Sequence, residues 1–471
     1  MNNDKSNLQV IKNIEITDIA DEGRAVARVN DLVVLLRNGV PGDVVDIHPV
    51  RWKKNYMEAE ITTFTKLSGR RTEPVCEHFG ICGGCKWQNM NYESQLHYKQ
   101  KQVEECFRRI AKINVLPVLP IIGSKEIFFY RNKLEFTFSS AADGDFENPE
   151  IQKSGNPKSS GVLGFHKPGR FDQVLNINNC HLQRDPSNAI RNEVRKFALE
   201  NNFSFYDCNR AGGLLRNLII RITTTGEVMV ILSFFYDDEA KRISLLNHLK
   251  EKFPDIKSLM FVINPKGNDT IFDREVILFS GSNHINEKIG NLQFRIGPKS
   301  FFQVNIPQSE KLFRTAVDFA GLRGTERVYD LYTGNGCIAL FASLLADHVT
   351  GIEYIDETIQ DARMNAQENR ISNVDFFSGD IKKVFTAEFI GIHGKPDVVI
   401  TDPPRSGMVP KVIERILLAG PQRIVYVSCN PATQARDVAL MSEKYYVDKI
   451  QPVDMFPHTQ HVESVALLIK K

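Results

Sequence analysis

Short apolar segments rich in β-branched residues recur along the last third of the sequence, with polar side chains at their ends. Residues 423–427 (RIVYV) and 465–469 (VALLI) are both typical of buried strands. Cys429 follows the first segment and Glu463 precedes the second. Strands that are apolar throughout belong to sheets covered by helices on both faces. This part of the sequence therefore predicts an α/β sheet.

A third apolar segment, residues 396–401, ends at Asp402, and two prolines follow it. If the strand after Glu463 runs antiparallel to the other two, its start lies beside their ends. Asp402, Cys429 and Glu463 then share the sheet edge where open α/β folds place their active sites. We therefore expect these three side chains to form one reactive site.

Cys429 stands between a strand end and a predicted helix start, because Asn430 and Pro431 are typical of a first helical turn. Exposed backbone N–H groups at a helix N-terminus carry partial positive charge, which should favour the thiolate. The alternative for such a cysteine is a small, buried and inert side chain. The two acidic residues that the fold should bring near it favour the reactive interpretation.

A Gly-rich turn lies upstream of these segments. Residues 327–332 are typical of a strand, residues 333–337 (TGNGC) of a tight turn and residues 338–346 of a helix. The next strand ends at Glu353, where an acidic residue would meet ribose hydroxyls. The full GxGxxG spacing of NAD-binding proteins is absent. S-adenosylmethionine, which has no pyrophosphate, fits this turn better.

The first part of the chain, residues 1–68, predicts a closed β-barrel of the oligonucleotide-binding (OB) kind, because short alternating strands are separated by Gly and Pro turns. Basic and aromatic residues alternate in it at Arg51, Trp52, Lys53, Lys54 and Tyr56. This mixture suits phosphate contacts and base stacking, and a solvated barrel rim is the alternative. Because the formal net charge is only +2, a nucleic-acid partner would be held by local patches.

Three cysteines cluster after the barrel, at Cys76, Cys82 and Cys85. The last two have the CxxC spacing that lets two thiolates bind one metal centre, and Cys180 is the best candidate for a fourth ligand. Four thiolates fit zinc or an iron–sulfur cluster, and spacing does not choose between them. His78 is a competing ligand that would favour zinc.

Residues 69–290 mix strand and helix patterns and predict a central α+β domain, followed by a catalytic domain over residues 291–471. Residues 91–113 predict an amphipathic helix, for which packing on the catalytic domain is one possibility. The polar stretch 141–160 predicts a loop. A candidate basic face, with ordinary surface charge as the alternative, consists of Arg131, Lys133, Arg210, Arg216 and Arg221.

No signal peptide and no apolar run of membrane-spanning length is visible in the sequence. We therefore expect a cytoplasmic monomer without membrane contact. In a reducing compartment, the eight cysteines argue for metal binding or catalysis over disulfides.

The order of these motifs resembles that of the RNA (uracil-5-)-methyltransferases, class I enzymes that use S-adenosylmethionine to make 5-methyluridine. The resemblance covers nearly the full length and implies an N-terminal TRAM barrel, a central domain with a cysteine-ligated cluster, and a Rossmann-like methyltransferase domain. It is carried by residues 301–305 (FFQVN), 330–336 (DLYTGNG), 402–405 (DPPR), 428–431 (SCNP) and 461–463 (HVE). The barrel and cysteines look more like the branch that methylates ribosomal RNA, such as 23S rRNA, than the tRNA branch.

The resemblance also implies roles for individual residues. Cys429 would be the nucleophile and Glu463 the base. A 4Fe-4S cluster, with zinc as the alternative, would be held by Cys76, Cys82, Cys85 and Cys180. The pocket for S-adenosylmethionine and uracil would be lined by Gln303, Tyr332, Glu353, Asp380 and Asp402. Relatives often carry asparagine or a small hydroxyl residue at the position of Cys337, which we leave without a role.

The expected chemistry explains these residue types. Uracil C5 is a poor carbon nucleophile, and addition of the Cys429 thiolate to C6 turns the ring into an enolate that accepts a methyl group at C5. Glu463 would then remove the C5 proton so that the cysteine leaves. Because the base must leave its stack, single-stranded or loop RNA is the expected substrate.

Three other functions stay open at this point. The substrate could be a tRNA uridine, or the protein could bind RNA without catalysis. A third candidate is an RNA cytosine C5-methyltransferase, but those enzymes usually carry a cysteine directly after a proline in the strand-end motif. Residues 402–404 (DPP) contain no cysteine.

Overall fold

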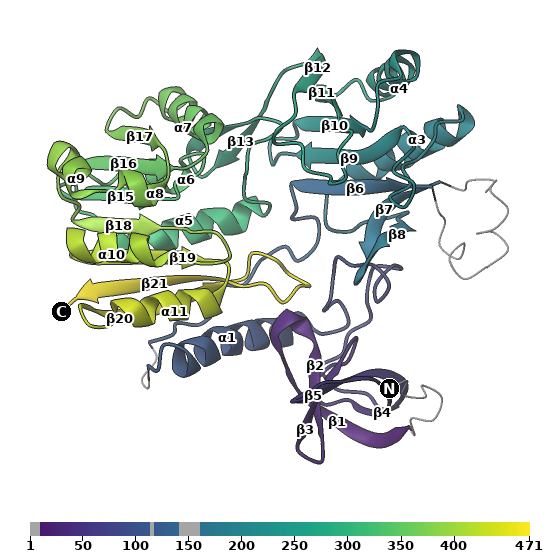
Figure 1. Cartoon of the computed structure of the whole chain (residues 1–471), viewed down its shortest axis with the longest axis horizontal. Coiled ribbons are helices and arrows are strands. Elements are labelled where there is room, and N and C mark those ends of the chain that lie inside the picture. Colours follow the sequence, from purple (N-terminus) through teal and green to yellow (C-terminus); the bar gives the residue numbers. More distant parts are fainter. Residues whose placement is uncertain (1–9, 114–116, 141–160) are drawn as a thin grey trace.

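The computed structural model describes residues 10–113, 117–140 and 161–471. The stretch 141–160, for which the sequence predicts a loop, lies outside these ranges. Figure 1 shows a small barrel (purple), a central sheet (blue to teal) and a larger helix-covered sheet (green to yellow).

The N-terminal barrel is closed by five strands in the order β1-β2-β3-β5-β4. These strands are β1 (Ile11–Ile19), β2 (Ala25–Val29), β3 (Leu32–Leu36), β4 (Val44–Trp52) and β5 (Tyr56–Lys66). Every second residue tends to point inward, and Ile16, Val34 and Ile47 are fully buried there. The short 3₁₀ turn η1 (Asp21–Gly23) connects β1 to β2.

The central sheet has seven strands in the order β12-β11-β10-β9-β6-β7-β8. The strands are β6 (Lys133–Ser139), β7 (Val162–Lys167), β8 (Arg170–Asn176), β9 (Leu215–Ile222), β10 (Val228–Phe234), β11 (Ile256–Ile263) and β12 (Val276–Gly281). Helices α3 (Ser187–Glu200) and α4 (Glu239–Lys252) pack on one face, and the hairpin of β13 (Ile285–Ile289) and β14 (Leu292–Ile296) packs on the other. All residues of β9 and β10 are buried, so this pair forms the middle of the layer.

The C-terminal sheet also has seven strands, in the order β17-β16-β15-β18-β19-β21-β20. The strands are β15 (Arg327–Leu331), β16 (His348–Glu353), β17 (Val374–Ser378), β18 (Val398–Thr401), β19 (Arg423–Ser428), β20 (Tyr445–Val453) and β21 (Glu463–Lys470). Neighbours from β17 through β19 pair in parallel, whereas β21 runs antiparallel to β19 with Ser464 opposite Ser428. The start of β21 therefore lies beside the carboxyl ends of the parallel strands, as expected from the sequence. This edge faces the central sheet in Figure 1.

Helices cover both faces of the C-terminal sheet. One face packs against α5 (Ile306–Ala320), α6 (Cys337–Ser343) and α7 (Asp356–Glu368). The other packs against α8 (Ile381–Val384), α9 (Ala387–His393), α10 (Pro410–Ala419) and α11 (Pro431–Met441). Neighbouring residues of β15 show the division, because Val328 joins the first core and Tyr329 the second. Apolar side chains on both faces explain the unbroken apolar runs in the sequence.

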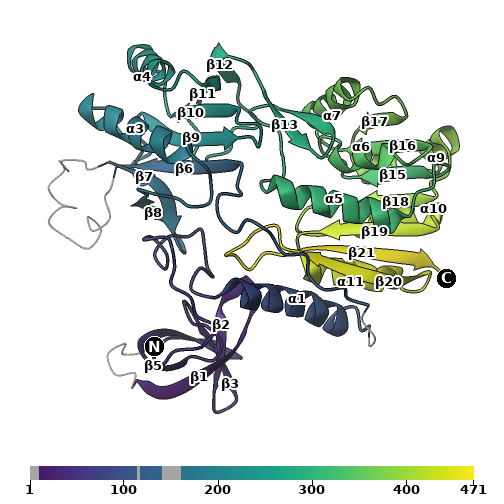
Figure 2. The same ribbon diagram turned by 180° about the vertical axis from the view of Figure 1, so that it is seen from behind.

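Helix α1 (Tyr92–Arg109) follows the barrel in sequence but packs on the C-terminal sheet. The Asn91 side chain caps the helix by accepting the Ser94 N–H at 2.9 Å. Val103 and Phe107 are fully buried in the core that α11 and β20 share. Figures 1 and 2 both show α1 between the barrel and the side of the C-terminal sheet that ends in β20.

The fold class expected from the sequence is confirmed: a closed barrel precedes an α+β region and an α/β domain whose sheet is covered by helices on both faces. The boundaries at residues 68 and 290 stay predictions. Within the described ranges, no helix is both long enough and apolar enough to cross a membrane.

Candidate active site

The loops after β18 and β19 are tied together at the carboxyl edge. Asn430 caps helix α11 by accepting the Ala432 N–H at 3.1 Å, and its Nδ2 donates to the carbonyl oxygen of Arg405 at 3.0 Å. Thr433 Oγ1 donates to the same carbonyl at 3.2 Å. These bonds fix the segment after Asp402 against the segment that carries Cys429.

Cys429 is half-buried, and its surroundings disfavour the thiolate. Burial, followed by the Glu463 and Asp402 carboxylates, raises the pKa of the Cys429 thiol to about 12, and Arg405 opposes this shift. The prediction that the helix N-terminus favours the thiolate is therefore wrong for the protein on its own. Burial and two acidic neighbours outweigh the partial charges of one helix.

The acidic residues at this edge form a connected group. Glu463 exposes 4 % of its surface, and burial followed by the charge of Asp402 raises its pKa well above the usual value. Burial also raises the pKa of Asp402, and Asp330 adds to the effect. The charges of Asp402 and Glu463 act on the pKa of Cys429, and that of Asp402 acts on the pKa of Glu463. This agrees with the expectation that the three side chains lie close together. Their catalytic roles stay predictions.

The Gly-rich turn between β15 and α6 has a left-handed backbone at three positions. The φ angles are 63° at Tyr332, 55° at Gly334 and 84° at Gly336. A Cβ built on Gly334 would meet nothing within 4 Å, so the turn is open there, whereas one on Gly336 would come within 2.9 Å of the Phe376 ring. The turn therefore leaves room for a ligand above Gly334.

Three predicted cofactor residues lie around this turn. Glu353 Oε2 accepts the Gly334 N–H at 3.2 Å, which holds the turn against the end of β16. Burial raises the pKa of the Tyr332 phenol to about 12, with contributions from Asp437, Asp380 and Glu353. Asp380 begins α8 by accepting the Lys382 N–H at 3.2 Å. Acidic side chains therefore line both sides of the turn.

Gln303 lies on the segment that leads into α5, and its carbonyl oxygen accepts from Asn132 Nδ2 at 2.9 Å. No interaction within the described residues links its side chain to the other predicted cofactor residues. Its role stays a prediction.

The sequence analysis did not assign a role to Asp330, which the structure connects to both groups. Asp330 exposes 1 % of its surface, and its Oδ1 has no hydrogen-bond partner among the described residues. Burial raises its pKa to about 7, and Glu353 adds to the effect. Asp330 lies near the end of β15 and pairs with Ile400 of β18, two residues before Asp402. An acidic residue close to a strand end was the available signal.

Cys337 is buried at the start of α6, and its Sγ donates to Asn335 Oδ1 at 3.2 Å. Burial raises the pKa of its thiol. It packs beside the Gly-rich turn as a neutral side chain.

The loop between β20 and β21, residues 454–462, is fixed by buried polar contacts. Lys99 on α1 and Asp454 form an ion pair of 2.5 Å in which both side chains are fully buried. Tyr92 OH donates to the same carboxylate at 2.8 Å, and the His458 N–H donates to Gln95 Oε1 at 2.8 Å. Helix α1 thus holds the loop that leads directly into Glu463.

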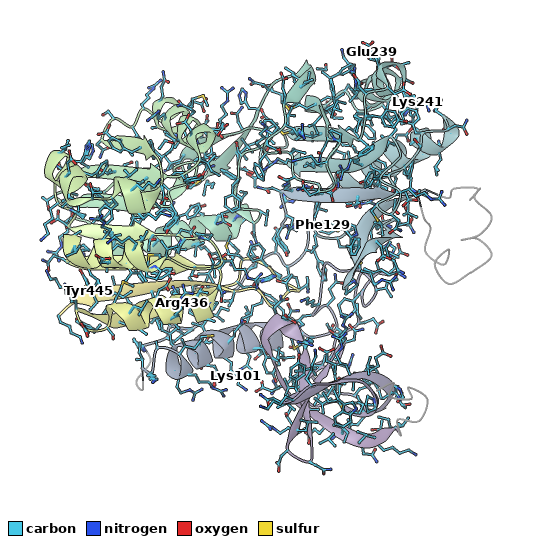
Figure 3. The ribbon with its side chains drawn as sticks, in the orientation of Figure 1. Lys101, Phe129, Glu239, Lys241, Arg436 and Tyr445 are labelled. Carbon is cyan, nitrogen blue, oxygen red and sulfur yellow. The ribbon has the colours of Figure 1, made fainter. Side chains whose placement is uncertain are left out.

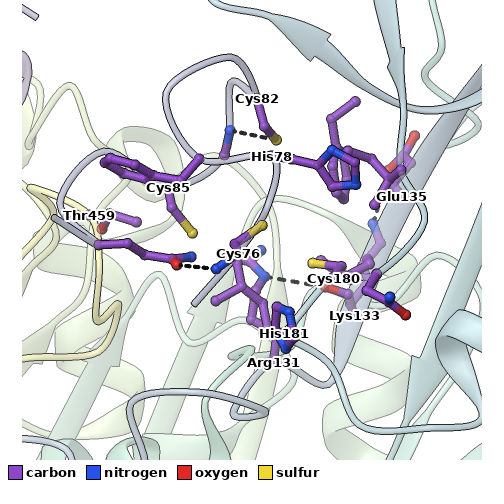
Figure 4. A pocket seen from close by; sticks show the side chains of 18 residues that line it. Cys76, His78, Cys82, Cys85, Arg131, Lys133, Glu135, Cys180, His181 and Thr459 are labelled. Atoms are coloured by element: carbon purple, nitrogen blue, oxygen red, sulfur yellow. Dashed lines mark hydrogen bonds and ion pairs between the residues drawn. The ribbon is translucent and has the colours of Figure 1, made fainter. Parts of the chain in front are cut away.

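The four predicted metal-binding cysteines line one cavity of about 330 Å³, together with Thr459 of this loop (Figure 4). Burial raises the pKa of all four thiols, to about 11 for Cys82 and about 12 for Cys85. The Gly84 N–H donates to Cys82 Sγ at 3.4 Å. Among the described residues, however, no group of three or more His, Cys, Asp or Glu side chains is arranged to hold a metal ion.

His78 lines the same cavity but is already engaged. Its Nε2 accepts the Asn178 N–H at 3.1 Å, which joins the first cysteine segment to the segment that carries Cys180. Burial lowers the pKa of His78. The neutral ring with Nε2 occupied is poorly suited to the ligand role that the sequence left open.

The prediction of a basic face is wrong for two of its five residues, because Arg216 and Arg221 are buried. Arg216 exposes 1 % of its surface and pairs with Asp269 at 2.9 Å. Arg221 exposes 5 % and donates to the carbonyl oxygen of Ser300 at 2.7 Å. Both side chains hold loops in place.

Comparison with known proteins bears on this site. The family model described as tRNA (uracil-5-)-methyltransferase matches residues 219–471. A protein from Bacteroides thetaiotaomicron, named an uncharacterized RNA methyltransferase, is 52 % identical over 96 % of this chain and 99 % of its own length. A protein of the same description from Chlorobaculum tepidum is 35 % identical over 96 % of this chain and 95 % of its own length.

Among solved structures, the chain is similar to the tRNA (uracil-54, C5)-methyltransferase of Pyrococcus abyssi, crystallised with S-adenosyl-L-homocysteine. The TM-score is 0.75 at 26 % identity, and the alignment covers 98 % of this chain and all of the other.

Proposed function

Because this chain belongs to the tRNA (uracil-5-)-methyltransferase family, we propose that it methylates C5 of a uridine in RNA through a covalent bond between Cys429 and C6 of that base. Family membership makes the protein an S-adenosylmethionine-dependent RNA methyltransferase. The proposal for the covalent step rests on one observation: a cysteine and two acidic residues meet at the carboxyl edge of the sheet.

The residues around the Gly-rich turn suit S-adenosylmethionine, which supplies the methyl group and carries a positive charge on its sulfur. Asp330 has an unpartnered buried carboxylate oxygen, and the charges of Glu353 and Asp380 both act on the Tyr332 phenol. Acidic groups that raise one another's pKa are stabilised by a cation in their midst. We assign cofactor binding to Gln303, Tyr332, Glu353 and Asp380, and add Asp330. Asp402 connects this group to Cys429.

In the proposed reaction, Cys429 loses its proton more readily once a cation balances the charges of Asp402 and Glu463. The thiolate adds to uracil C6, and C5 of the resulting enolate would attack the sulfonium methyl of S-adenosylmethionine, whose S–CH3 bond breaks to leave S-adenosylhomocysteine. Glu463 then accepts the C5 proton, and the electrons of the C5–H bond expel the sulfur from C6. A buried carboxylate with a raised pKa is a stronger base than an exposed one, which suits Glu463 for this step.

For the cavity of Figure 4, we propose a 4Fe-4S cluster held by Cys76, Cys82, Cys85 and Cys180, with zinc as the alternative. A single zinc ion needs four ligand atoms at about 2.3 Å, whereas a cluster spreads its ligands around a larger centre. Four cysteines around one cavity supply the four thiolate ligands that a cluster needs. The engagement of His78 also favours an all-cysteine set.

The RNA substrate has two candidates. We propose 23S ribosomal RNA first, because the barrel and the cysteines resemble the ribosomal branch. The similarity to the Pyrococcus abyssi enzyme favours tRNA as the second candidate, since the alignment covers the whole of a protein that acts on tRNA. Because the alignment spans the whole of that tRNA enzyme, the arrangement of domains does not by itself separate a ribosomal RNA substrate from a tRNA substrate. The cytoplasmic location and monomeric state stay predictions.

The proposal is tested by incubating the purified protein with labelled S-adenosylmethionine and either 23S rRNA or tRNA transcripts, then identifying the modified nucleosides by mass spectrometry. We expect 5-methyluridine in one of the two RNAs and no product from Cys429→Ala, with unchanged thermal unfolding of that variant. Undiminished turnover in Cys429→Ala, or 5-methylcytidine as the product, would contradict the proposal.

A further inference from the structure

Phe129 has a backbone conformation that bulky residues avoid. Among the described phenylalanine, tyrosine and tryptophan residues, only Phe129 and Tyr332 have a positive φ, at 54° and 63°. In this region the Cβ and the following carbonyl crowd one another, so the conformation persists only where surrounding contacts hold it. Tyr332 lies at the candidate cofactor site. The strain at Phe129 has no explanation within the site described so far.

Both neighbours of Phe129 are anchored in the loop that leads to Glu463. The Phe128 ring lies against the His458 ring with centroids 4.4 Å apart. Tyr130 OH donates to the carbonyl oxygen of Pro457 at 3.1 Å. These two contacts fix the chain on either side of Phe129.

The backbone of Phe129 is held from the other side by the wall of the cysteine cavity. Its N–H donates to the carbonyl oxygen of His181 at 2.8 Å, one residue after Cys180. The Phe129 ring meets the His181 ring edge-on, with centroids 6.0 Å apart. The strained conformation is therefore fixed by contacts to both the cysteine segment and the catalytic loop.

Packing does not account for the Phe129 side chain. It exposes 43 % of its surface, whereas Phe136 and Phe138 in the adjoining strand β6 expose 0 % and 1 %. Figure 3 shows Phe129 between the central sheet and the β20–β21 loop, on the side where the active edge lies. An exposed ring that is held in an unfavourable conformation suits contact with another molecule.

Positive charges surround the loop against which both neighbours of Phe129 are anchored. Burial lowers the pKa of His461 to about 4, and Arg405, Lys86, Lys99 and Arg131 add to the shift, so these cations surround the same loop. Lys99 is paired with Asp454, but Arg405 and Lys86 form no ion pair with an acid among the described residues. Lys86 Nζ does donate to the carbonyl oxygen of Glu22 at 2.8 Å. An exposed aromatic ring and cations that adjoin the same loop are the combination that binds single-stranded nucleic acid.

We propose that Phe129 stacks on a base of the RNA substrate, next to the path by which the target uridine reaches Cys429. This inference rests on the proposed function, because it requires an RNA substrate. The ring supplies a flat apolar face and the cations supply phosphate contacts. The strain is retained because it aims the ring, not because the fold needs it.

The test compares Phe129→Gly, Phe129→Leu and Phe129→Trp with the wild-type protein, using a fluorescein-labelled single-stranded RNA that contains uridine. Glycine adopts the left-handed conformation freely, so Phe129→Gly should keep or raise the thermal unfolding temperature. It should weaken RNA binding about tenfold, as expected for loss of one stacked base. Phe129→Leu should bind as weakly, and Phe129→Trp should bind like the wild type.

A second readout separates stacking from packing. With 2-aminopurine beside the uridine, binding to the wild type and to Phe129→Trp should change the base fluorescence, and binding to Phe129→Leu should not. Ala211→Gly is the matched control, because Ala211 is exposed and also has a positive φ of 49°. It should relieve strain without changing RNA affinity.

Two results would overturn this inference and leave the proposed function standing. In the first, Phe129→Gly binds RNA with wild-type affinity; in the second, it loses both RNA binding and thermal stability. Failure of the wild type to bind or methylate any RNA would overturn both this inference and the proposed function.

Discussion

The thiol of Cys429 lies in a balance of charges that its own sequence motif does not reveal. The helix N-terminus and Arg405 favour the thiolate, whereas burial, Glu463 and Asp402 favour the thiol, and the second group prevails with a pKa near 12. The Cys429 thiol is therefore protonated at neutral pH, and a cation in the site would lower its pKa. This arrangement would protect the thiolate from side reactions when no cofactor is bound.

This balance predicts opposite effects for two substitutions. Below its pKa, the reactivity of Cys429 with iodoacetamide follows the thiolate fraction and rises with pH. Asp402→Asn removes a negative charge, lowers the pKa and should increase the rate at pH 8 by about threefold to tenfold. Arg405→Gln removes a positive charge, raises the pKa and should decrease the rate.

The rate is measured from the mass of the Cys429 peptide, which separates it from exposed Cys208. Asp448→Asn is the control, because this acidic residue is exposed on β20 and should not affect the rate. Equal rates for all variants would show that the carboxylate and the guanidinium do not act on the thiol.

At the scale of elements, the β20–β21 loop is the structure on which the site depends. It has no regular secondary structure, yet α1 holds it through the buried pair of Lys99 and Asp454 and the bond that the His458 N–H donates to Gln95 Oε1. The loop also contributes Thr459 to the cysteine cavity and ends at Glu463. Helix α1 therefore positions Glu463 from a distant part of the sequence.

Lys99→Met should destabilise the protein by about 3–5 kcal/mol, because it leaves the Asp454 carboxylate buried without a counter-charge. The double variant Lys99→Met/Asp454→Asn should recover at least half of this loss, since no uncompensated charge remains. Urea unfolding can be followed by fluorescence of Trp87, whose ring lies 5.9 Å from Lys99 Nζ.

Lys101→Met on the same helix is the control. Lys101 pairs with Asp18 at 2.7 Å, but the two side chains expose 39 % and 35 % of their surface, so the loss should be below about 1 kcal/mol. Similar losses for Lys99→Met and Lys101→Met would mean that the buried pair does not hold the loop.

At the scale of the whole molecule, the cysteine cavity joins parts that are far apart in the sequence. Cys76, Cys82 and Cys85 follow the barrel, Cys180 belongs to the central region, and Thr459 comes from the C-terminal sheet. A bound centre would therefore fix the barrel linker, the central sheet and the catalytic loop relative to one another.

Cys180→Ser should abolish the bound centre and lower the thermal unfolding temperature. Elemental analysis and the visible absorption spectrum of protein purified without oxygen should show iron and sulfide in the wild type and neither in the variant. Cys208→Ser, at an exposed cysteine outside the cavity, should keep both. Zinc without iron in the wild type would support the alternative ligand, and absence of any metal would contradict the site.

The fold and the reactive edge could be predicted because they depend on local patterns. Apolar runs identify the strands, and an acidic or thiol residue at the end of each run identifies the edge that collects them, as for Asp402 and Cys429. The Gly-rich turn and the CxxC spacing are equally local.

The features that were missed depend on tertiary contacts. The high pKa of Cys429 comes from two carboxylates on other strands, and the role of α1 comes from Lys99 meeting Asp454, more than three hundred residues away. Arg216 and Arg221 have the composition of a basic surface, but burial makes them structural. Sequence patterns do not report which charges meet.

The central claim, that Cys429 forms a covalent bond with the substrate base and Glu463 resolves it, is tested most directly with Glu463→Gln. This variant should add to C6 and accept the methyl group but fail to remove the C5 proton, so that a protein–RNA complex survives on denaturing gels. Mass spectrometry should locate the RNA on the peptide that contains Cys429. A variant that still turns over without such a complex, or RNA attached to another residue, would contradict the account.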